Sequence, residues 1–310
     1  MYPKLSDAEI QQVEQGSAVA KVLNTPEKEE IIIFGAIRLT IPVKTFVEHI
    51  RDVERLQDGE NYIVVKKFSD PPVMADVQQL TLDEDDIEDL QECKPGDCDI
   101  QLPDLEIQQF RNQIDWNSKD AANQVNHMAQ EKALEVLQRY RKYGTRGLRD
   151  YRDKKDPLNI QRTYENLLNR TDALPVQLPE FYDYLLNYPD VSLPGTEDFF
   201  YWEKVKFGLK PTIRGVHAII YEAKEGDRSD WVIAFKQLYS THYFLAALDL
   251  WFCLEDPDSG GFYLITLKGS RQHGLTGFKG SIVRKVVVGR TRDSVEQALN
   301  YLKANFERSN

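Results

Sequence analysis

The sequence predicts an α+β protein in which a curved antiparallel sheet wraps around a long C-terminal helix. Two observations lead to this fold class. Near the start, an apolar strand runs into a proline and then into an amphipathic helix. Near the end, four apolar strands joined by short turns precede a long helix, which is typical of an antiparallel meander. A helix held across such a sheet leaves a cavity, and a cavity favours a small apolar ligand.

The first elements are predicted from local patterns. Ser6 and Glu9 have the spacing of a capping box at the start of a short helix. The continuous apolar run over residues 30–41 predicts a strand. Apolar residues spaced by three and four positions predict a helix over residues 43–56, and a second strand is expected at 62–65.

A helical insertion is expected over residues 80–200. The segment 70–99 holds eleven acidic residues against one lysine, and part of this acidity suits the first turn of a helix. Gly144 is expected to end the longest helix of the insertion. The four consecutive aromatic residues at 199–202 are expected to fill the core rather than to bind a cofactor.

The core of the protein is expected to consist of residues 30–70 and 205–308, in a single domain that spans residues 1–310. The predicted meander strands cover residues 212–221, 231–239, 243–254 and 262–267. The terminal helix is predicted to carry an apolar face formed by Ile282, Val286, Val295, Leu299, Leu302 and Phe306. No linker-like segment bounds the insertion, so we expect it to form a cap on the core.

The charge of the chain limits its partners. It has 39 Lys and Arg against 50 Asp and Glu, a net charge of −11. This balance excludes a nucleic-acid binder, because phosphate contacts need clustered basic side chains. Residues 201–310 are nevertheless basic, with 16 Lys and Arg against 12 Asp and Glu. This part of the chain suits peripheral contact with an anionic membrane, although a solvated surface of mixed charge explains the same numbers.

Two cysteines bear on localisation. Cys93 and Cys98 flank a Pro-Gly turn that brings their side chains within bonding range, and both a disulfide and a reduced pair remain open. A disulfide favours a periplasmic or secreted protein whose signal peptide was removed, and a reduced pair favours a cytoplasmic protein. No apolar run is long enough to span a membrane. Neither the cysteines nor the acidic segment has metal-ligand spacing, so no metal and no cofactor are predicted.

Polar side chains within the apolar meander are the candidate binding residues. Lys236 lies in an apolar strand, where a buried polar group without a partner costs several kcal/mol, so it either pairs inside the fold or faces a polar ligand group. Strand alternation places Gln237 and Tyr239 on one face and Lys236 on the other. The predicted ligand-binding residues are Arg214, His217, Lys236, Gln237, Tyr239, His242 and Tyr243. His217 and His242 are also the candidate proton carriers of an acid–base mechanism.

The Gly-rich stretch 269–280 has two interpretations. As a mobile loop, it would close Leu275 and Phe278 over the mouth of the cavity. As a simple connection, it would only lead into the terminal helix.

Several sequence features together follow the pattern of a known superfamily. They are Gly35 in the first strand, Pro42 at the corner, Phe46, Arg51 and Asp52 in the following helix, the meander at 212–267, and Val295, Glu296, Gln297, Ala298 and Leu299 in the last helix. In this order the chain resembles the START-like, or helix-grip, superfamily, also called Bet v 1-like, over about half of its length. It also resembles a group of uncharacterised bacterial proteins. The resemblance implies binding of lipids, sterols, polyketides or similar apolar molecules, and a minority of the superfamily are enzymes.

The leading functional prediction is binding or transport of a lipid-like apolar molecule in an internal cavity, without catalysis. The chain has no GxSxG, HExxH, Walker A or GxGxxG motif, so the sequence itself does not indicate an enzyme. Two alternatives remain open. One is an enzyme acting on a lipid-like or polyketide-like substrate, and the other is a protein-interaction module with a filled core.

Overall fold

One antiparallel sheet forms the centre of the molecule. The computed structural model describes residues 3–57, 61–156, 158–171, 174–207, 210–225 and 228–308. Its strands are β1 (Val19–Leu23), β2 (Glu30–Leu39), β3 (Tyr62–Lys67), β4 (Thr196–Lys206), β5 (Pro211–Glu225), β6 (Arg228–Ser240), β7 (Phe244–Asp256) and β8 (Gly261–Gln272). They lie in the order β1-β2-β8-β7-β6-β5-β4-β3. Strands β5 to β8 form the antiparallel meander that the sequence predicts.

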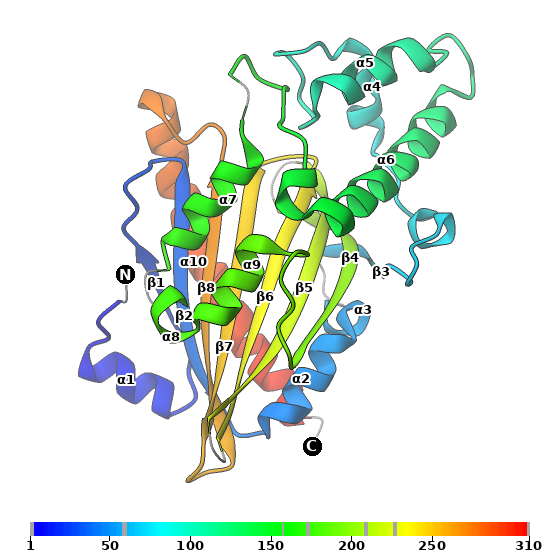
Figure 1. The fold of residues 1–310 in the computed structure, drawn as a ribbon. Helices are drawn as coiled ribbons and strands as arrows, with labels where there is room; N and C mark the ends of the chain where they lie inside the picture. The colour runs from blue at the N-terminus through cyan, green and yellow to red at the C-terminus, as the bar shows by residue number, and fades with distance from the viewer. Residues whose placement is uncertain are drawn as a thin grey trace.

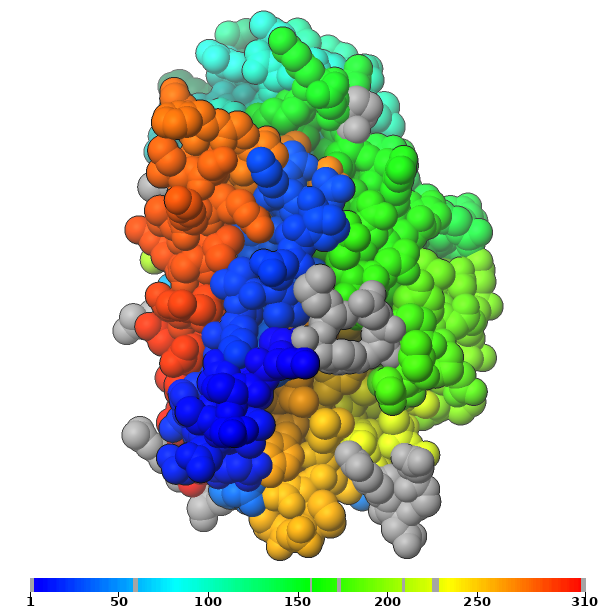
Figure 2. All heavy atoms as spheres, turned by 90° about the vertical axis from the view of Figure 1, so that its left-hand side faces the viewer, coloured from blue at the N-terminus to red at the C-terminus, as the bar shows by residue number. Residues whose placement is uncertain are grey.

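Helices cover both faces of the sheet, so the molecule has three layers (Figures 1 and 2). The helices are α1 (Asp7–Glu14), α2 (Val43–Arg51), α3 (Val53–Leu56), α4 (Glu84–Glu92), α5 (Asp104–Gln113), α6 (Ala121–Tyr143), α7 (Ile160–Asn169), α8 (Leu174–Gln177), α9 (Pro179–Asn187) and α10 (Gly277–Arg308), with short 3₁₀ turns η1 (Met74–Val77) and η2 (Gly144–Gly147). Helices α2, α3 and α10 cover one face, the inner face. Helices α7, α8 and α9 cover the other, the outer face. A sheet packed around its long C-terminal helix is the helix-grip arrangement.

Strand β2 shows why the sequence pattern is continuous rather than alternating. Ile31 and Ile33 pack on the inner face beside α10, whereas Ile32 and Phe34 pack on the outer face. Both faces of the strand are buried, so the run between Glu30 and Arg38 has no charged residue. At Gly35 the helix comes closest, because an added Cβ would lie 2.8 Å from Leu299 Cδ1 and 2.7 Å from Thr266 Oγ1. Glycine at this position therefore sets how closely α10 approaches the sheet.

Helix α10 has two halves with different surroundings. Val295, Leu299 and Phe306 are buried against the inner face, as predicted. The prediction is wrong for Ile282 and Val286, which are 57% and 48% exposed. The first turns of α10 extend beyond the end of the sheet, where no strand covers them (Figure 1).

Two strands were not predicted. Strand β1 is a short apolar run within residues 1–28, which are polar overall, and it pairs with β2 at the edge of the sheet. Strand β4 contains the aromatic run 199–202, so the predicted insertion 80–200 includes the first five residues of this strand, 196–200. Its last helix, α9, ends at Asn187. The aromatic residues do fill the core, with Tyr201 and Trp202 each 1% exposed, but on opposite faces of a strand.

The Gly-rich stretch 269–280 is mostly regular structure. Strand β8 continues to Gln272 and α10 begins at Gly277, so the expectation of a long mobile loop is wrong. Leu275 is buried in the inner core, and Phe278 is 87% exposed in the first turn of α10. Neither side chain lines the cavity described below.

The insertion places α4, α5 and α6 at one end of the sheet (Figure 1). Leu134 of α6 packs on Trp202 and Ile213 of the sheet. A disulfide joins Cys93, at the end of α4, to Cys98. Helix α6 ends at Gly144, as predicted. Only glycine fits there, because an added Cβ would clash with the carbonyl oxygen of Tyr188. None of the described helices combines the length and the apolar character needed to cross a bilayer.

Candidate functional site

A cavity of about 410 Å³ lies between the inner face of the sheet and the C-terminal half of α10. The end of α2, together with α3 and the start of β3, closes one side. Its apolar wall consists of Leu56, Phe207, Phe235, Trp251, Val295, Leu299, Leu302 and Phe306. The volume lies within the range of about 300–1,000 Å³ that is usual for small-molecule sites. We call it the inner cavity.

Two ion pairs form a polar floor on the sheet side of the inner cavity. Glu203 on β4 and Arg214 on β5 are partners in register, with 3.0 Å between Arg214 Nε and Glu203 Oε1. Asp249 on β7 and Lys268 on β8 are also partners in register, with 3.0 Å between their charged atoms. The side chains of Glu203 and Arg214 are 1% and 14% exposed, whereas those of Asp249 and Lys268 are 23% and 34% exposed.

In the first pair, burial and the attraction between the two charges act in opposite directions. Burial raises the pKa of Glu203, although Arg214 acts in the opposite direction. Burial also opposes the charged form of Arg214, but Glu203 beside it leaves the pKa of the guanidinium raised. Arg214 further lies over the rings of Phe207 and Phe244, at 5.1 and 5.7 Å from their centroids. The guanidinium is thus a fixed positive charge, and Glu203 is the member of the pair that takes up a proton as the pH falls.

Several buried polar atoms that line the inner cavity have no hydrogen-bond partner among the described residues. They are Gln57 Oε1, Glu203 Oε2, Trp251 Nε1 and Thr266 Oγ1. Buried polar groups in proteins are nearly always paired with protein, water or ligand. The indole can donate, the two carbonyl-type oxygens can accept, and the hydroxyl can do both. The cavity therefore offers an apolar wall and an unsatisfied polar floor to the same guest.

Only one of the predicted ligand-binding residues, Arg214, lines the inner cavity. His217 is three residues further along β5, and an odd spacing on a strand places it on the outer face. There its ring lies 3.2 Å from Asp198 Oδ2 and 3.0 Å from the hydroxyl of Tyr140. Burial lowers the pKa of His217, although Asp198 opposes this. The ring is fully buried in a closed hydrogen-bonded group.

The side chains of Lys236, Gln237 and Tyr239 point to three different parts of the molecule. Lys236 is the register partner of His217 and lines a second cavity on the outer face. Gln237 points to the inner face and donates to the carbonyl oxygen of Phe244 at 3.0 Å. Tyr239 was predicted to share the face of Gln237, and this is wrong. A register shift on β6 makes Tyr239 the partner of Gly215, so Tyr239 faces a small apolar pocket beneath α5 and α6.

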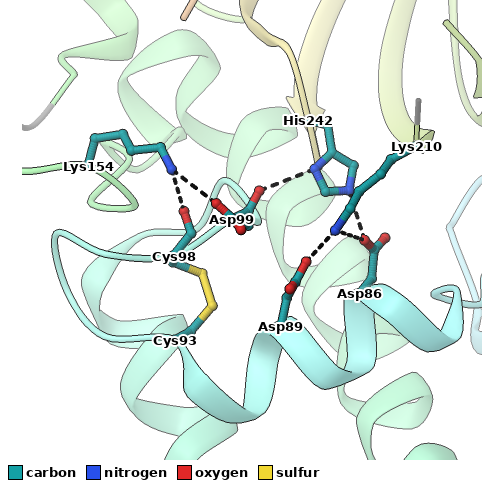
Figure 3. Close-up of a disulfide and its surroundings, with 8 residues drawn as sticks. All are labelled: Asp86, Asp89, Cys93, Cys98, Asp99, Lys154, Lys210 and His242. Atoms are coloured by element: carbon teal, nitrogen blue, oxygen red, sulfur yellow. Dashed lines mark hydrogen bonds and ion pairs between the residues drawn. A yellow bond between two sulfur atoms is a disulfide. The ribbon is translucent and has the colours of Figure 1, made fainter. Parts of the chain in front are cut away.

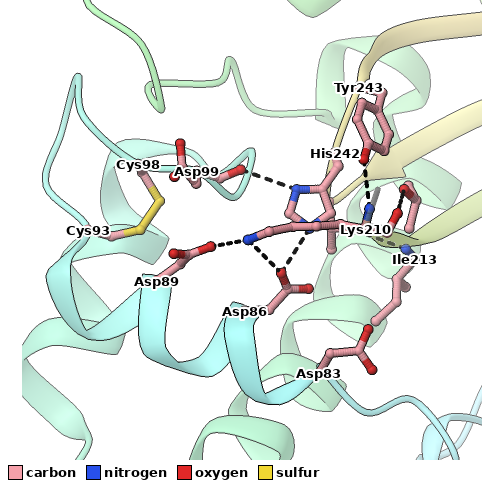
Figure 4. Close-up of polar contacts among 12 residues, drawn as sticks. Asp83, Asp86, Asp89, Cys93, Cys98, Asp99, Lys210, Ile213, His242 and Tyr243 are labelled. Carbon is pink, nitrogen blue, oxygen red and sulfur yellow. Dashed lines mark hydrogen bonds and ion pairs between the residues drawn. A yellow bond between two sulfur atoms is a disulfide. The ribbon is translucent and has the colours of Figure 1, made fainter. Parts of the chain in front are cut away.

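His242 and Tyr243 lie where the sheet meets α4. The two ring nitrogens of His242 face Asp86 Oδ1 at 3.1 Å and the carbonyl oxygen of Asp99 at 3.2 Å (Figure 3). Lys210 reaches across to Asp86 and Asp89 (Figure 4). The hydroxyl of Tyr243 accepts a hydrogen bond from the backbone N–H of Lys210 at 2.9 Å. These contacts join α4 to the end of the sheet.

The disulfide stands at the other end of this junction (Figure 3). Lys154 donates to the carbonyl oxygen of Cys98 at 2.8 Å, and the following residue, Asp99, presents its carbonyl oxygen to His242. The sequence left both a disulfide and a reduced cysteine pair possible, and the structure has the disulfide. The bond closes the loop 93–98, and Asp99, which contacts His242, directly follows it.

Acid–base chemistry by the two predicted histidines gains no support from this geometry. His217 and His242 lie on different parts of the molecule, and neither lines the inner cavity. Each is held by hydrogen bonds to protein groups.

Sequence reasoning missed most of the polar floor. Glu203, Asp249, Thr266 and Lys268 were not among the candidates, and Trp251 was treated only as part of a strand. The signal existed for Asp249, which is a lone carboxylate between Leu248 and Leu250 in an apolar strand. Like Lys236, Asp249 needs a partner, because a charge buried in an apolar strand is costly without one. The partner itself follows only from the register with β8.

Comparisons with known proteins add little to this description. No protein-family model matches the chain, and no curated protein matches it. Solved structures do match, among them a fragment (25–204) of the STAR-related lipid transfer protein from Xanthomonas axonopodis, with 9% sequence identity and a TM-score of 0.40. The match covers 93% of this chain and 94% of that chain. A similarity of this size carries no information about ligand or activity.

Proposed function

We propose that this protein binds an amphipathic, lipid-like small molecule in the inner cavity, without acting on it chemically. The observation that carries this proposal is the combination of an apolar wall with an unsatisfied polar floor in a cavity of about 410 Å³. An apolar body of the ligand would pack between α10 and the sheet. A polar group, such as a hydroxyl, would meet Thr266, Trp251 and Glu203 on the floor.

The two parts of such a site would contribute differently. Apolar contact supplies most of the affinity, at roughly 25 cal/mol for each Å² removed from water. The polar floor supplies orientation, because a ligand without a polar group leaves the floor unpaired. Since both cations of the floor already have carboxylate partners, the floor favours a neutral polar group over an anion.

Ligand titration tests this proposal. Purified protein is titrated with fluorescent fatty acids, sterols and lysophospholipids, and solvent extracts of the protein are analysed by mass spectrometry. Leu299→Trp fills the cavity from α10 and should weaken binding at least about tenfold. Val176→Trp is a matched control, because Val176 is 75% exposed on α8, away from the cavity. Absence of any titratable or co-purified apolar molecule would contradict the proposal and favour a protein-interaction module.

We also propose that the first half of α10 contacts anionic membranes, which would let a bound lipid-like molecule be exchanged. Phe278, Ile282, Val283 and Val286 are exposed and follow one another along one side of the helix. Residues 259–292 contain no Asp or Glu, although the chain as a whole has a net charge of −11. An apolar stripe flanked only by basic side chains is typical of an interfacial helix. In Figure 2 this end of α10 (orange) lies on the surface of the molecule.

Vesicle sedimentation tests the membrane contact. Binding to phosphatidylcholine vesicles should rise when phosphatidylserine is added and fall with salt, because each basic side chain near such a surface contributes about 1 kcal/mol. The variant Phe278→Ser/Ile282→Ser should lose binding but keep its affinity for the ligand of the inner cavity. Val176→Ser serves as the control for loss of an exposed apolar side chain. Equal binding by both variants would contradict the proposal.

A further inference from the structure

A buried amine lies on the outer face, away from the inner cavity. Lys236 is only 4% exposed, in the middle of the sheet. Its Nζ donates to Thr145 Oγ1 at 2.6 Å and to the carbonyl oxygen of Leu185 at 3.3 Å. Both acceptors are neutral, so they orient the ammonium group without balancing its charge.

Within the described parts of the chain, no carboxylate forms an ion pair with Lys236. The groups that face it include the rings of Tyr140 and Tyr164, whose centroids lie 5.5 and 5.1 Å from Nζ. An ammonium group has three N–H bonds, and the protein supplies hydrogen-bond acceptors for two of them. A third acceptor and a negative charge are therefore missing, and a buried ammonium group needs both.

An open volume adjoins this amine. A cavity of about 400 Å³, which we call the outer pocket, lies between β6, α7, α9 and η2. Besides Lys236, its lining is rich in hydroxyl and amide groups, including those of Tyr143, Gln161, Tyr164, Asn169, Tyr182 and Asn187. Of its other charged side chains, Arg146 is paired with Asp190, and Glu165 accepts a hydrogen bond from Gln161 at 2.9 Å.

We propose that the outer pocket is a second ligand site, which binds a small carboxylic acid as its carboxylate on Lys236. The carboxylate would supply the missing acceptor and the missing charge. The tyrosine and amide groups would receive the rest of the molecule, which points to an aromatic or hydroxylated acid. This site does not depend on the inner cavity, whose cations are already paired.

The pH dependence of binding distinguishes this site from a surface lysine. Burial lowers the pKa of Lys236 to about 7. A carboxylate binds the ammonium form, so its affinity should fall about tenfold for each pH unit above 7. Of the neighbouring groups, His217 is paired with Asp198, and burial lowers the pKa of the imidazole. The other charged side chains that line the pocket are those of Arg146 and Glu165.

Calorimetric titration with 4-hydroxybenzoate between pH 6 and pH 9 tests the proposal, with 4-hydroxybenzamide as the uncharged control. The acid should bind best at the lower end of the range and lose affinity above pH 7, whereas the amide should bind weakly at every pH. Lys236→Met should weaken binding of the acid at least about tenfold. Lys285→Met, which removes an exposed lysine of α10, should change nothing.

A second measurement uses the unchanged protein, in case the variant fails to fold. Fluorodinitrobenzene modifies neutral amines, and peptide mapping follows each lysine separately. Lys236 should be modified with a midpoint near pH 7, and 4-hydroxybenzoate should protect it while the amide does not. Affinity that is the same from pH 6 to pH 9, equal binding of acid and amide, or protection of no lysine would each overturn the proposal.

Discussion

The two faces of the sheet carry cavities of nearly equal size, about 410 Å³ inside and about 400 Å³ outside, but their charges are arranged differently. On the inner face, each cation of the floor meets a carboxylate from the neighbouring strand, as Arg214 meets Glu203. On the outer face, Lys236 meets a hydroxyl and a backbone carbonyl instead.

This difference teaches that the volume of a cavity does not decide what it binds. An inner floor that is already neutralised adds no net attraction for an anion, so its guest is expected to be amphipathic and neutral at its polar end. An unpaired ammonium group has the opposite preference, because burial without a counter-charge costs several kcal/mol that a carboxylate can recover. Variants that each remove one charge, on the inner or the outer face, test this difference through their effects on stability.

The largest expected loss of stability follows Arg214→Met. Glu203 is then left as a buried carboxyl group without a cation, and the free energy of unfolding at pH 7 should fall by about 3 kcal/mol. Burial already raises the pKa of Glu203 in the intact pair, and loss of Arg214 raises it further. A carboxyl group whose pKa is raised by folding destabilises the protein above its unfolded pKa and ceases to do so as the pH falls. Urea denaturation should therefore show a smaller loss at pH 5 than at pH 7.

Two controls define that result. Arg51→Met removes an exposed ion pair with Glu197, whose side chain is 58% exposed, and should cost at most about 1 kcal/mol. The double variant Arg214→Met/Glu203→Gln removes both charges and should recover most of the loss. A double variant no more stable than the single one would show that packing of the guanidinium, rather than its charge, holds the floor.

Lys236→Met is expected to increase the stability of the protein, in contrast to Arg214→Met. The substitution removes a buried charge and keeps a similar volume, so the free energy of unfolding at pH 7 should rise by about 3 kcal/mol. The pKa of Lys236 is about 7 in the folded protein, far below its value in the unfolded chain. At a pH between these two pKa values, the unfolded chain therefore binds one more proton than the folded protein. The intact protein therefore gains stability as the pH rises, and the advantage of the variant should shrink by about 1.4 kcal/mol for each unit above pH 7.

Denaturation of both proteins at pH 7 and pH 9 measures this advantage. Lys285→Met is the reference for loss of an exposed lysine. If the variant is less stable than the intact protein at every pH, the hydrogen bonds to Thr145 and Leu185 outweigh the cost of burial, and the contrast between the two faces fails.

The smallest effect is expected at the second pair of the inner floor. Asp249→Asn leaves Lys268 without its carboxylate partner, but the lysine side chain is 34% exposed and water can solvate it. The expected loss of stability is at most about 1 kcal/mol. A loss as large as that of Arg214→Met, measured by the same denaturation, would show that the whole floor is buried as one unit.

Local sequence patterns predicted the main elements correctly. The apolar run of β2, the spacing of apolar residues in α2 and the meander from β5 to β8 are all visible in the sequence because each depends on residues close together in the chain. Strand β1 was missed because its apolar run is only five residues long, stands among polar residues and is ordered by pairing with β2. The first turns of α10 were misjudged because periodicity shows an apolar stripe and does not show whether anything covers it.

The candidate site was predicted only in part. The sequence identified Lys236 as a charge in an apolar strand and Arg214 as a candidate ligand-binding residue, and both do line cavities. It did not identify Glu203 or Asp249, whose importance depends on the strand that each one faces. It also placed Tyr239 on the wrong face, because a single extra residue in β6 reverses the alternation beyond it.

The sequence by itself thus determined the fold class, the order of the elements and the presence of charges in apolar strands, since these are properties of short segments. The tertiary structure alone decided which charges meet, since Arg214 and Glu203 are partners only through the register of β4 with β5. It also decided that Lys236 has no carboxylate partner among the residues that the structure describes. Local patterns report what a side chain needs, and only the packing of distant segments shows whether that need is met.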